Sequence, residues 1–127
     1  MIRCTTARVD LKAVESNFKA ISAYLTNESG LNRGAGRGPS IAPGIIAVVK
    51  ANAYGHGATA VGRTLEDAGA AMLACADIEE GVALRDAGVT TPILVFGALS
   101  VSDLDGVFTH RLTPTLLTKQ IIYYERF

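Results

Sequence analysis

The stretch that decides the fold is Ile45-Ile-Ala-Val-Val-Lys-Ala-Asn-Ala-Tyr-Gly-His-Gly57. Its first five residues, Ile45 to Val49, are apolar and mostly β-branched, which predicts a strand buried on both faces. Lys50 follows at once, and a helical pattern begins after Gly57. The lysine therefore falls where a strand ends and its loop begins, the position that carries chemistry in parallel α/β folds.

Lys50 places a primary amine at this strand end. The surrounding strand ends are expected to desolvate the amine partly, which favours its neutral, nucleophilic form. Such a lysine can form a Schiff base with a carbonyl, including the aldehyde of pyridoxal phosphate. The alternative is a lysine that only extends its charged head into solvent, and the apolar run alone does not choose between the two.

The string Val49-Lys-Ala-Asn-Ala-Tyr-Gly-His-Gly57 resembles the cofactor attachment motif of alanine racemases. The likeness in strand order and spacing extends from about Arg8 to about Thr115. It implies that Lys50 holds pyridoxal 5'-phosphate as a Schiff base and is the base for one alanine enantiomer. It also implies that Tyr54 hydrogen-bonds the cofactor phosphate. By the same resemblance, the expected activity is interconversion of L-alanine and D-alanine in a homodimer, supplying D-alanine for cell-wall peptidoglycan. The N-terminal residues contain no long apolar segment, so a cytoplasmic location is expected.

Three further positions in the motif have structural alternatives. A structural role for Tyr54, with a buried hydroxyl bonded to the protein, is the alternative to cofactor binding. His56 stands between two glycines, and we expect its ring to tie down the loop rather than act in catalysis, although its tunable charge keeps the second role open. Asn52 is expected to orient the loop by bonding backbone groups.

The rest of the chain repeats the same pattern. Asp10 is placed to cap a helix that runs to about Tyr24. Asp77 and Glu80 have the spacing of a capping box. Further helices are expected over 58–68 and 78–87 with a short turn at 100–104, and strands over 71–76, 92–96 and within 107–115, with a possible strand at 7–10. Strands alternating with helices predict a parallel sheet, here part of a (β/α)8 TIM-type barrel with about four βα units.

Residues 1–127 are expected to form one domain, the N-terminal part of such a barrel. The polar, glycine-rich segment 27–44 is predicted to be a flexible insertion loop, and the segment 116–127 departs from the family pattern. Four strands cannot close a barrel, so we expect a truncated chain of low or no activity. In the family, the acid/base group opposite the lysine is a tyrosine of a C-terminal domain that this sequence does not contain, and Tyr123 and Tyr124 are not assigned to that role.

Composition narrows the function further. Hydrophobic residues make up 49% of the chain and charged residues 19%, and 12 basic residues balance 12 acidic ones. This balance argues against nucleic-acid or membrane-surface binding. Cys4 and Cys75 have no metal-ligand spacing, so no metal site is expected, and Cys75 is predicted to be a core residue. A non-catalytic cofactor-binding fragment, an inert remnant and a racemase for another amino acid remain as alternatives.

Overall fold

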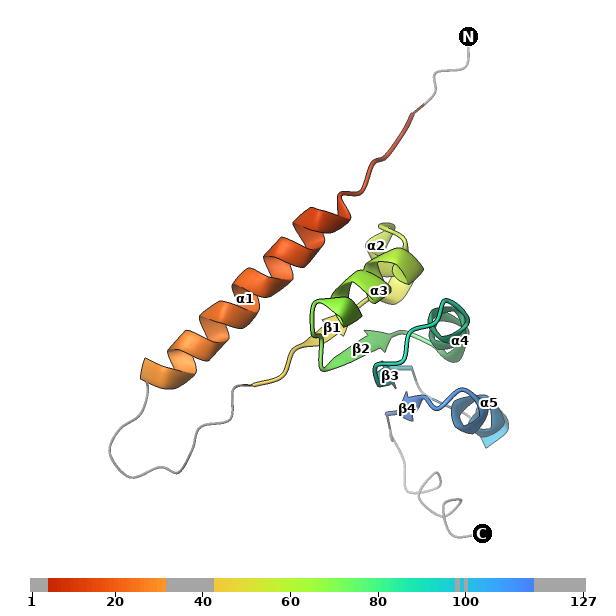
Figure 1. Ribbon diagram of the computed structural model, residues 1–127. Helices are drawn as coiled ribbons and strands as arrows, with labels where there is room; N and C mark the ends of the chain where they lie inside the picture. The colour runs from red at the N-terminus through yellow and green to blue at the C-terminus, as the bar shows by residue number, and fades with distance from the viewer. Residues whose placement is uncertain (1–4, 32–42, 98, 100, 116–127) are drawn as a thin grey trace, which may run out of the picture.

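The protein is described by a computed structural model, which places residues 5–31, 43–97, 99 and 101–115. Four parallel strands lie side by side in chain order: β1 (Ile46–Val48), β2 (Met72–Cys75), β3 (Ile93–Val95) and β4 (Thr113–Pro114) (Figure 1). Each strand therefore pairs with the next one along the sequence, as in a β/α barrel. The predicted parallel α/β fold is confirmed.

Helices connect the strands. The elements are α1 (Leu11–Leu31), α2 (Lys50–Tyr54), α3 (Ala58–Asp67), α4 (Ile78–Asp86), the 3-10 helix η1 (Val101–Asp103) and α5 (Leu104–Thr109). The Asp10 carboxylate accepts hydrogen bonds from the amides of Lys12 and Ala13 at the start of α1, which confirms the predicted cap. Among the helices described, none combines the length and the apolar character needed to cross a membrane.

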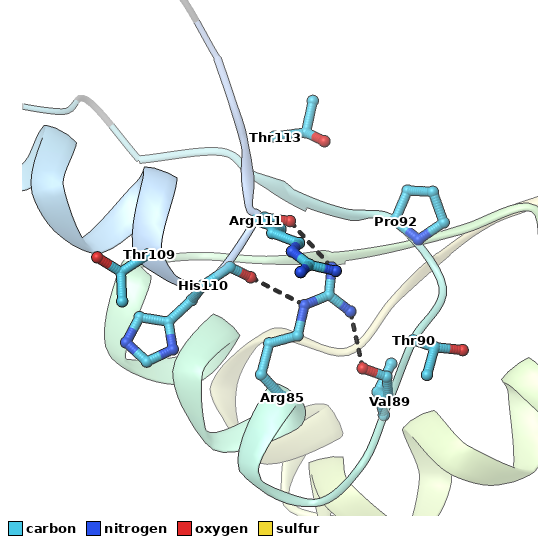
Figure 2. A pocket seen from close by; sticks show the side chains of 8 residues that line it. All are labelled: Arg85, Val89, Thr90, Pro92, Thr109, His110, Arg111 and Thr113. Carbon is cyan, nitrogen blue, oxygen red and sulfur yellow. Dashed lines mark hydrogen bonds between the residues drawn. The ribbon is translucent and has the colours of Figure 1, made fainter.

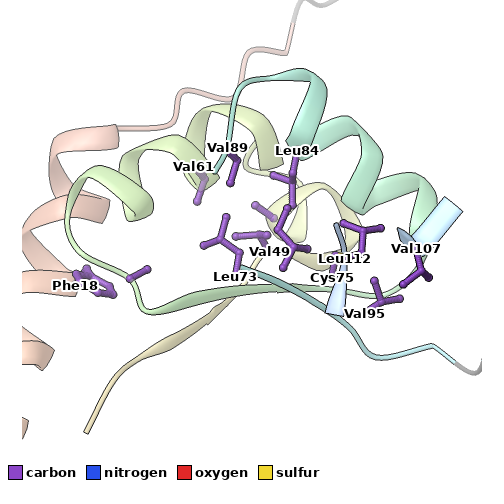
Figure 3. Packing of buried hydrophobic residues seen from close by; sticks show 13 residues of the cluster. Phe18, Val49, Val61, Leu73, Cys75, Leu84, Val89, Val95, Val107 and Leu112 are labelled. Atoms are coloured by element: carbon purple, nitrogen blue, oxygen red, sulfur yellow. The ribbon is translucent and has the colours of Figure 1, made fainter. Parts of the chain in front are cut away.

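The core lies between one face of the sheet and the helices (Figure 3). Leu73 and Ile93 are fully buried on this face, and Leu84 of α4 is fully buried against them. Cys75 is also buried, which confirms its predicted place in the core. Burial, with smaller effects from the Glu80 and Asp77 carboxylates, raises the pKa of its thiol to about 12, so the thiol is neutral and a poor nucleophile.

The opposite face of the sheet differs from the sequence prediction. β1 is not buried on both faces, because Ile46 is 51% exposed and Val48 is also exposed. Phe96, just after β3, is a further exposed apolar side chain. The reason is that the described helices cover one face only, so alternate side chains of the apolar run face solvent.

Three element boundaries also differ from the sequence prediction. Residues 7–10 form no strand in the described part of the chain, and α1 continues to Leu31, into the segment predicted to be a loop from residue 27. No proline interrupts 25–31, so the polar residues there can extend the helix. α5 continues through Gly106, where an added Cβ would lie 3.3 Å from Ile78 Cγ2, so the glycine allows α5 to approach Ile78 closely. The segment 32–42 and the atypical end 116–127 lie outside the described residues.

A single carboxylate joins α3 to the loop before β3. Glu66 Oε1 accepts hydrogen bonds from the amides and hydroxyls of Thr90 and Thr91, at 2.7–2.9 Å. Partial burial raises the pKa of this carboxyl, but the hydrogen bonds from the two threonines together outweigh that effect and lower the pKa to about 2. The charged form is therefore the one that stabilises the fold.

Glu66→Gln should lower the free energy of unfolding at pH 7 by about 2 kcal/mol, because the hydrogen bonds lose a charged acceptor. The contribution of Glu66 is present above pH 4.5, the ordinary carboxyl value, and is lost as the pH falls towards about 2. Urea unfolding followed by circular dichroism should therefore show the gap between the wild-type chain and the variant narrowing from pH 5 to pH 2. The exposed neighbour Asp67, changed to Asn, is the control. An equal gap at both pH values would contradict the assignment.

Candidate active site

Lys50 stands where the sequence placed it, at the carboxyl end of β1. The residue before it, Val49, is 1% exposed, and its amide donates to the carbonyl of Ala74 in β2 at 2.8 Å. The backbone just before the lysine is therefore held inside the sheet. The Lys50 side chain itself is exposed. The prediction that the strand ends desolvate the amine is therefore wrong for the described residues. No described helix covers the second face of the sheet, and the lysine side chain is open to solvent.

The loop after Lys50 is not irregular but a left-handed helical turn, α2. Ala51, Asn52 and Ala53 have φ values of 51°, 54° and 52° with ψ between 45° and 50°, and Tyr54 follows at φ 54°. Left-handed backbone costs roughly 1–2 kcal/mol for each residue that carries a Cβ. Only Asn52 is a residue that often adopts it. Strained backbone of this kind is concentrated at functional sites.

Two side chains of the motif hold this turn in place. The Asn52 Oδ1 atom accepts from the amide of Ala58, the first residue of α3, at 2.8 Å. The His56 Nδ1 atom lies 2.9 Å from the Ala53 carbonyl and 3.1 Å from the Tyr54 carbonyl, so with its proton on Nδ1 the ring donates back into the turn. Both predicted roles, orientation of the loop by Asn52 and a structural ring at His56, are confirmed.

Glycine is required on both sides of His56. Gly55 has a φ of 84° and Gly57 a φ of 90°, a region of the backbone that glycine enters without a steric penalty. Gly55 ends the left-handed turn, and Gly57 turns the chain into α3. The Gly-His-Gly sequence therefore serves the exit from the turn rather than the chemistry directly.

Glu80 is the site residue that sequence reasoning missed. Its spacing from Asp77 predicts a capping box, and half of the box forms, since the Asp77 carboxylate accepts from the Glu80 amide at 2.9 Å. The Glu80 carboxylate does not return to Asp77. Its Oε1 accepts from the Ala51 amide at 2.6 Å and its Oε2 from the Ala76 amide at 2.8 Å. The only signal in the sequence was an acidic residue shortly after a strand, and that signal does not reveal a partner 29 residues away.

The end of β3 joins the same edge. The Gly97 amide donates to the Ala76 carbonyl at 2.8 Å, and the Phe96 amide donates to the Cys75 carbonyl at 3.0 Å. A Cβ on Gly97 would lie 2.6 Å from the Ala76 oxygen, so this approach needs glycine. The carboxyl ends of three strands are thus linked, and the Lys50 turn is attached to this edge.

Tyr54 lies on the same turn as Lys50, and its side chain is 60% exposed. The alternative of a buried structural tyrosine is therefore wrong. Within the described part of the chain, neither the Lys50 Nζ nor the Tyr54 hydroxyl has a hydrogen-bond partner. An amine and a phenol on one turn are both available to a ligand.

A cavity of about 610 Å³ lies at the opposite, amino-terminal edge of the sheet (Figure 2). It is not the candidate active site. Arg85, which lines it, is occupied by carbonyl oxygens: its Nε donates to His110, its Nη1 to Val89 and Thr91, and its Nη2 to Arg111, at 2.8–3.0 Å. The guanidinium joins the loops before β3 and β4, which is a structural role.

Comparison with known proteins identifies the family of this chain. The family described as alanine racemase, N-terminal domain, matches residues 9–123. The chain belongs to this family. It is 39% identical over 120 residues to the alanine racemase of Symbiobacterium thermophilum, covering 94% of this chain and 28% of that protein. It is 42% identical over 114 residues to the enzyme of Geobacillus stearothermophilus, covering 90% of this chain and 26% of the relative.

Solved alanine racemase structures share the fold. The structure from Bacillus anthracis, described with bound L-Ala-P, superposes with a TM-score of 0.74 at 30% identity, over 96% of this chain and 29% of that one. The structure from Streptomyces lavendulae gives a TM-score of 0.73 at 28% identity, over 91% of this chain and 26% of that one. The alanine racemase N-terminal sequence described here thus spans between a quarter and a third of the length of these relatives.

The left-handed turn α2 predicts an unusual response to glycine. Ala51→Gly should raise the free energy of unfolding by about 0.5 kcal/mol, because the relieved strain of roughly 1–2 kcal/mol exceeds the entropic cost of glycine. Urea titration would measure the change. The matched control is Ala60→Gly on the exposed side of right-handed α3, which should lower stability by about 1 kcal/mol. Equal losses in both variants would show that Ala51 is not left-handed.

Proposed function

We propose that this chain is the lysine-bearing segment of a pyridoxal-phosphate-dependent alanine racemase. The observation that carries the proposal is the strained turn α2, which holds an exposed amine, Lys50, and an exposed phenol, Tyr54, at the carboxyl end of a parallel strand. Membership of the alanine racemase N-terminal domain family supports the reaction class. The chemistry of the two side chains supports the cofactor.

The groups present fit two ends of pyridoxal phosphate. An aldehyde needs a primary amine, which Lys50 supplies at the end of β1. A phosphate needs hydrogen-bond donors, and the Tyr54 hydroxyl can be one of them. Both side chains are exposed, so a ligand can reach them. When bound, the cofactor ring takes up the electrons freed at the Cα of an amino acid joined to it.

Lys50 has two tasks in this proposal. Its Nζ would hold the cofactor aldehyde covalently, and as a free amine the same Nζ would remove or return the Cα proton on one face of the substrate. Both tasks require the amine to remain at one place beside the cofactor. The bonds made by Asn52, His56 and Glu80 hold the backbone that follows the lysine. The hydrogen bond from the Val49 amide to the Ala74 carbonyl holds the backbone before it.

Racemisation also needs an acid/base group on the second face of the substrate. Among the described residues, the titratable side chains that bond to the turn are Glu80 and His56, and both are engaged with its backbone. We infer that this group comes from a further domain of a partner subunit in a homodimer, as the resemblance to the family implies. The proposal extends to a cytoplasmic enzyme that provides D-alanine for peptidoglycan, with residues 1–127 as the N-terminal part of its barrel.

One other function is favoured because the Glu80 carboxylate and the His56 ring are both bound to the backbone of the turn. It is that of a binding segment, which holds pyridoxal phosphate with Lys50 and Tyr54 without turnover. The two functions are separated by exchange of the alanine α-proton in deuterated water, followed by NMR. Exchange indicates that Lys50 acts as a base. Cofactor binding without exchange indicates the non-catalytic alternative.

Lys50→Ala should abolish covalent attachment of pyridoxal phosphate. The chain is incubated with the cofactor, reduced with borohydride and mapped by peptide mass spectrometry. The modification is expected on the peptide that contains Lys50 and is expected to be absent from the variant. Lys12→Ala, which removes an exposed lysine of α1, should leave it intact. A modification that persists in the Lys50 variant would refute the assignment.

Tyr54→Phe should weaken cofactor binding about tenfold while the covalent link to Lys50 still forms. Removing one hydrogen bond to a charged phosphate costs at least the roughly 1.4 kcal/mol that corresponds to this factor. Absorbance titration with pyridoxal phosphate would measure the dissociation constant. Tyr24→Phe, on an exposed tyrosine of α1, is the matched control. An unchanged constant in the Tyr54 variant would remove this residue from the phosphate site.

A further inference from the structure

One carboxylate connects the turn that carries Lys50 to the neighbouring strand. Glu80 Oε1 accepts from the Ala51 amide at 2.6 Å, and Glu80 Oε2 accepts from the Ala76 amide at 2.8 Å. Ala51 directly follows Lys50 and is the first residue of the left-handed turn, and Ala76 directly follows β2. The half-buried side chain of Glu80 therefore fixes the distance between the ends of β1 and β2 at the site.

The Ala51 amide has a particular need for this partner. The first amides of a helical turn have no acceptor within the turn, and α2 satisfies its later amides internally, for example Ala53 to Val49 at 2.8 Å and Gly55 to Ala51 at 3.0 Å. An ionised carboxylate is a stronger acceptor than a carbonyl. Glu80 thus gives the Ala51 amide a charged acceptor at the residue where the strained, left-handed backbone begins.

A role in capping α4 alone does not explain this arrangement. The α4 helix already has its cap in Asp77, whose Oδ1 accepts from the Glu80 amide. The Glu80 carboxylate leaves its own helix and reaches across to the residue after Lys50. Glu79, the preceding residue, is exposed. The two glutamates are both in the first turn of α4 and differ in the contact with Ala51.

We propose that Glu80 is a positioning residue for Lys50. It holds the Ala51 amide so that the left-handed turn, and with it the lysine amine and Tyr54, stays in one arrangement towards the cofactor. This inference rests on the proposed function of Lys50. It assigns to Glu80 no proton transfer and no contact with substrate.

The test compares Glu80→Gln with Glu79→Gln in the full chain. The glutamine keeps the shape of the side chain, but its one oxygen can accept from only one of the two amides, and its NH₂ group faces the other. We expect the covalent adduct of pyridoxal phosphate with Lys50, trapped by borohydride, to form about tenfold more slowly in Glu80→Gln. It should form at the wild-type rate in Glu79→Gln.

Amide hydrogen exchange followed by NMR gives a readout that does not depend on the cofactor. In Glu80→Gln, exchange at Ala51 or Ala76 should become at least tenfold faster, while the Leu73 amide, bonded to the Pro92 carbonyl inside the sheet, should keep its wild-type rate. This pattern separates a local loss of position from general unfolding. If Glu80→Gln fails to fold, Glu80→Asp replaces it, since the shorter side chain keeps the charge but cannot reach both amides.

Trapping in Glu80→Gln within twofold of the wild-type rate would overturn the inference and leave the proposed function intact. Slower trapping would also overturn it if amide exchange at Leu73 became faster by the same factor as at Ala51 and Ala76, because the slower trapping would then come from global destabilisation. If the wild-type chain itself traps no cofactor on Lys50, the proposed function fails first, and the inference fails with it. The amide exchange would then still report whether the Glu80 bridge exists.

Discussion

The arrangement of the site depends on one constraint, the parallel direction of the four strands. Parallel strands bring all their carboxyl ends to one edge of the sheet, and the direct order from β1 to β4 brings the residues after β1, β2 and β3 together there. The burial of Leu73, Ile93 and Leu84 between sheet and helices stabilises this order. Backbone amides that lie far apart in sequence can then share a single carboxylate.

Strain and hydrogen bonding are balanced at this edge. The turn after Lys50 keeps four consecutive residues with a Cβ at positive φ, which is unfavourable for an isolated peptide. Glu80 and His56 bond to backbone groups of the turn, and the Asn52 side chain bonds the turn to the first amide of α3. A turn of this kind is more closely defined than a flexible loop, which suits a lysine that has to both bind a cofactor and move a proton.

The opposite edge of the sheet serves stability. There Arg85 binds four carbonyl oxygens of the loops before β3 and β4, and Glu66 binds the two threonines that precede β3. These interactions leave the amino-terminal edge with a cavity but no group comparable to the Lys50 amine. The division between a chemical edge and a stabilising edge is the one expected of β/α barrels.

The sequence by itself determined the parallel α/β fold, the place of Lys50 at a strand end and the local hydrogen-bonding roles of Asp10, Asn52 and His56. These features depend on apolar periodicity and on contacts between residues close in the chain, which a sequence displays directly. The resemblance to alanine racemases could likewise be recognised from the sequence, because its motif lies within residues 49–57. Tertiary structure alone decided the exposed second face of β1, the left-handed form of α2 and the destination of the Glu80 carboxylate. Each of these depends on contacts between parts of the chain that are far apart in sequence. The described helices do not cover the second face of β1, and the Glu80 carboxylate bonds to an amide 29 residues away at the start of the strained turn.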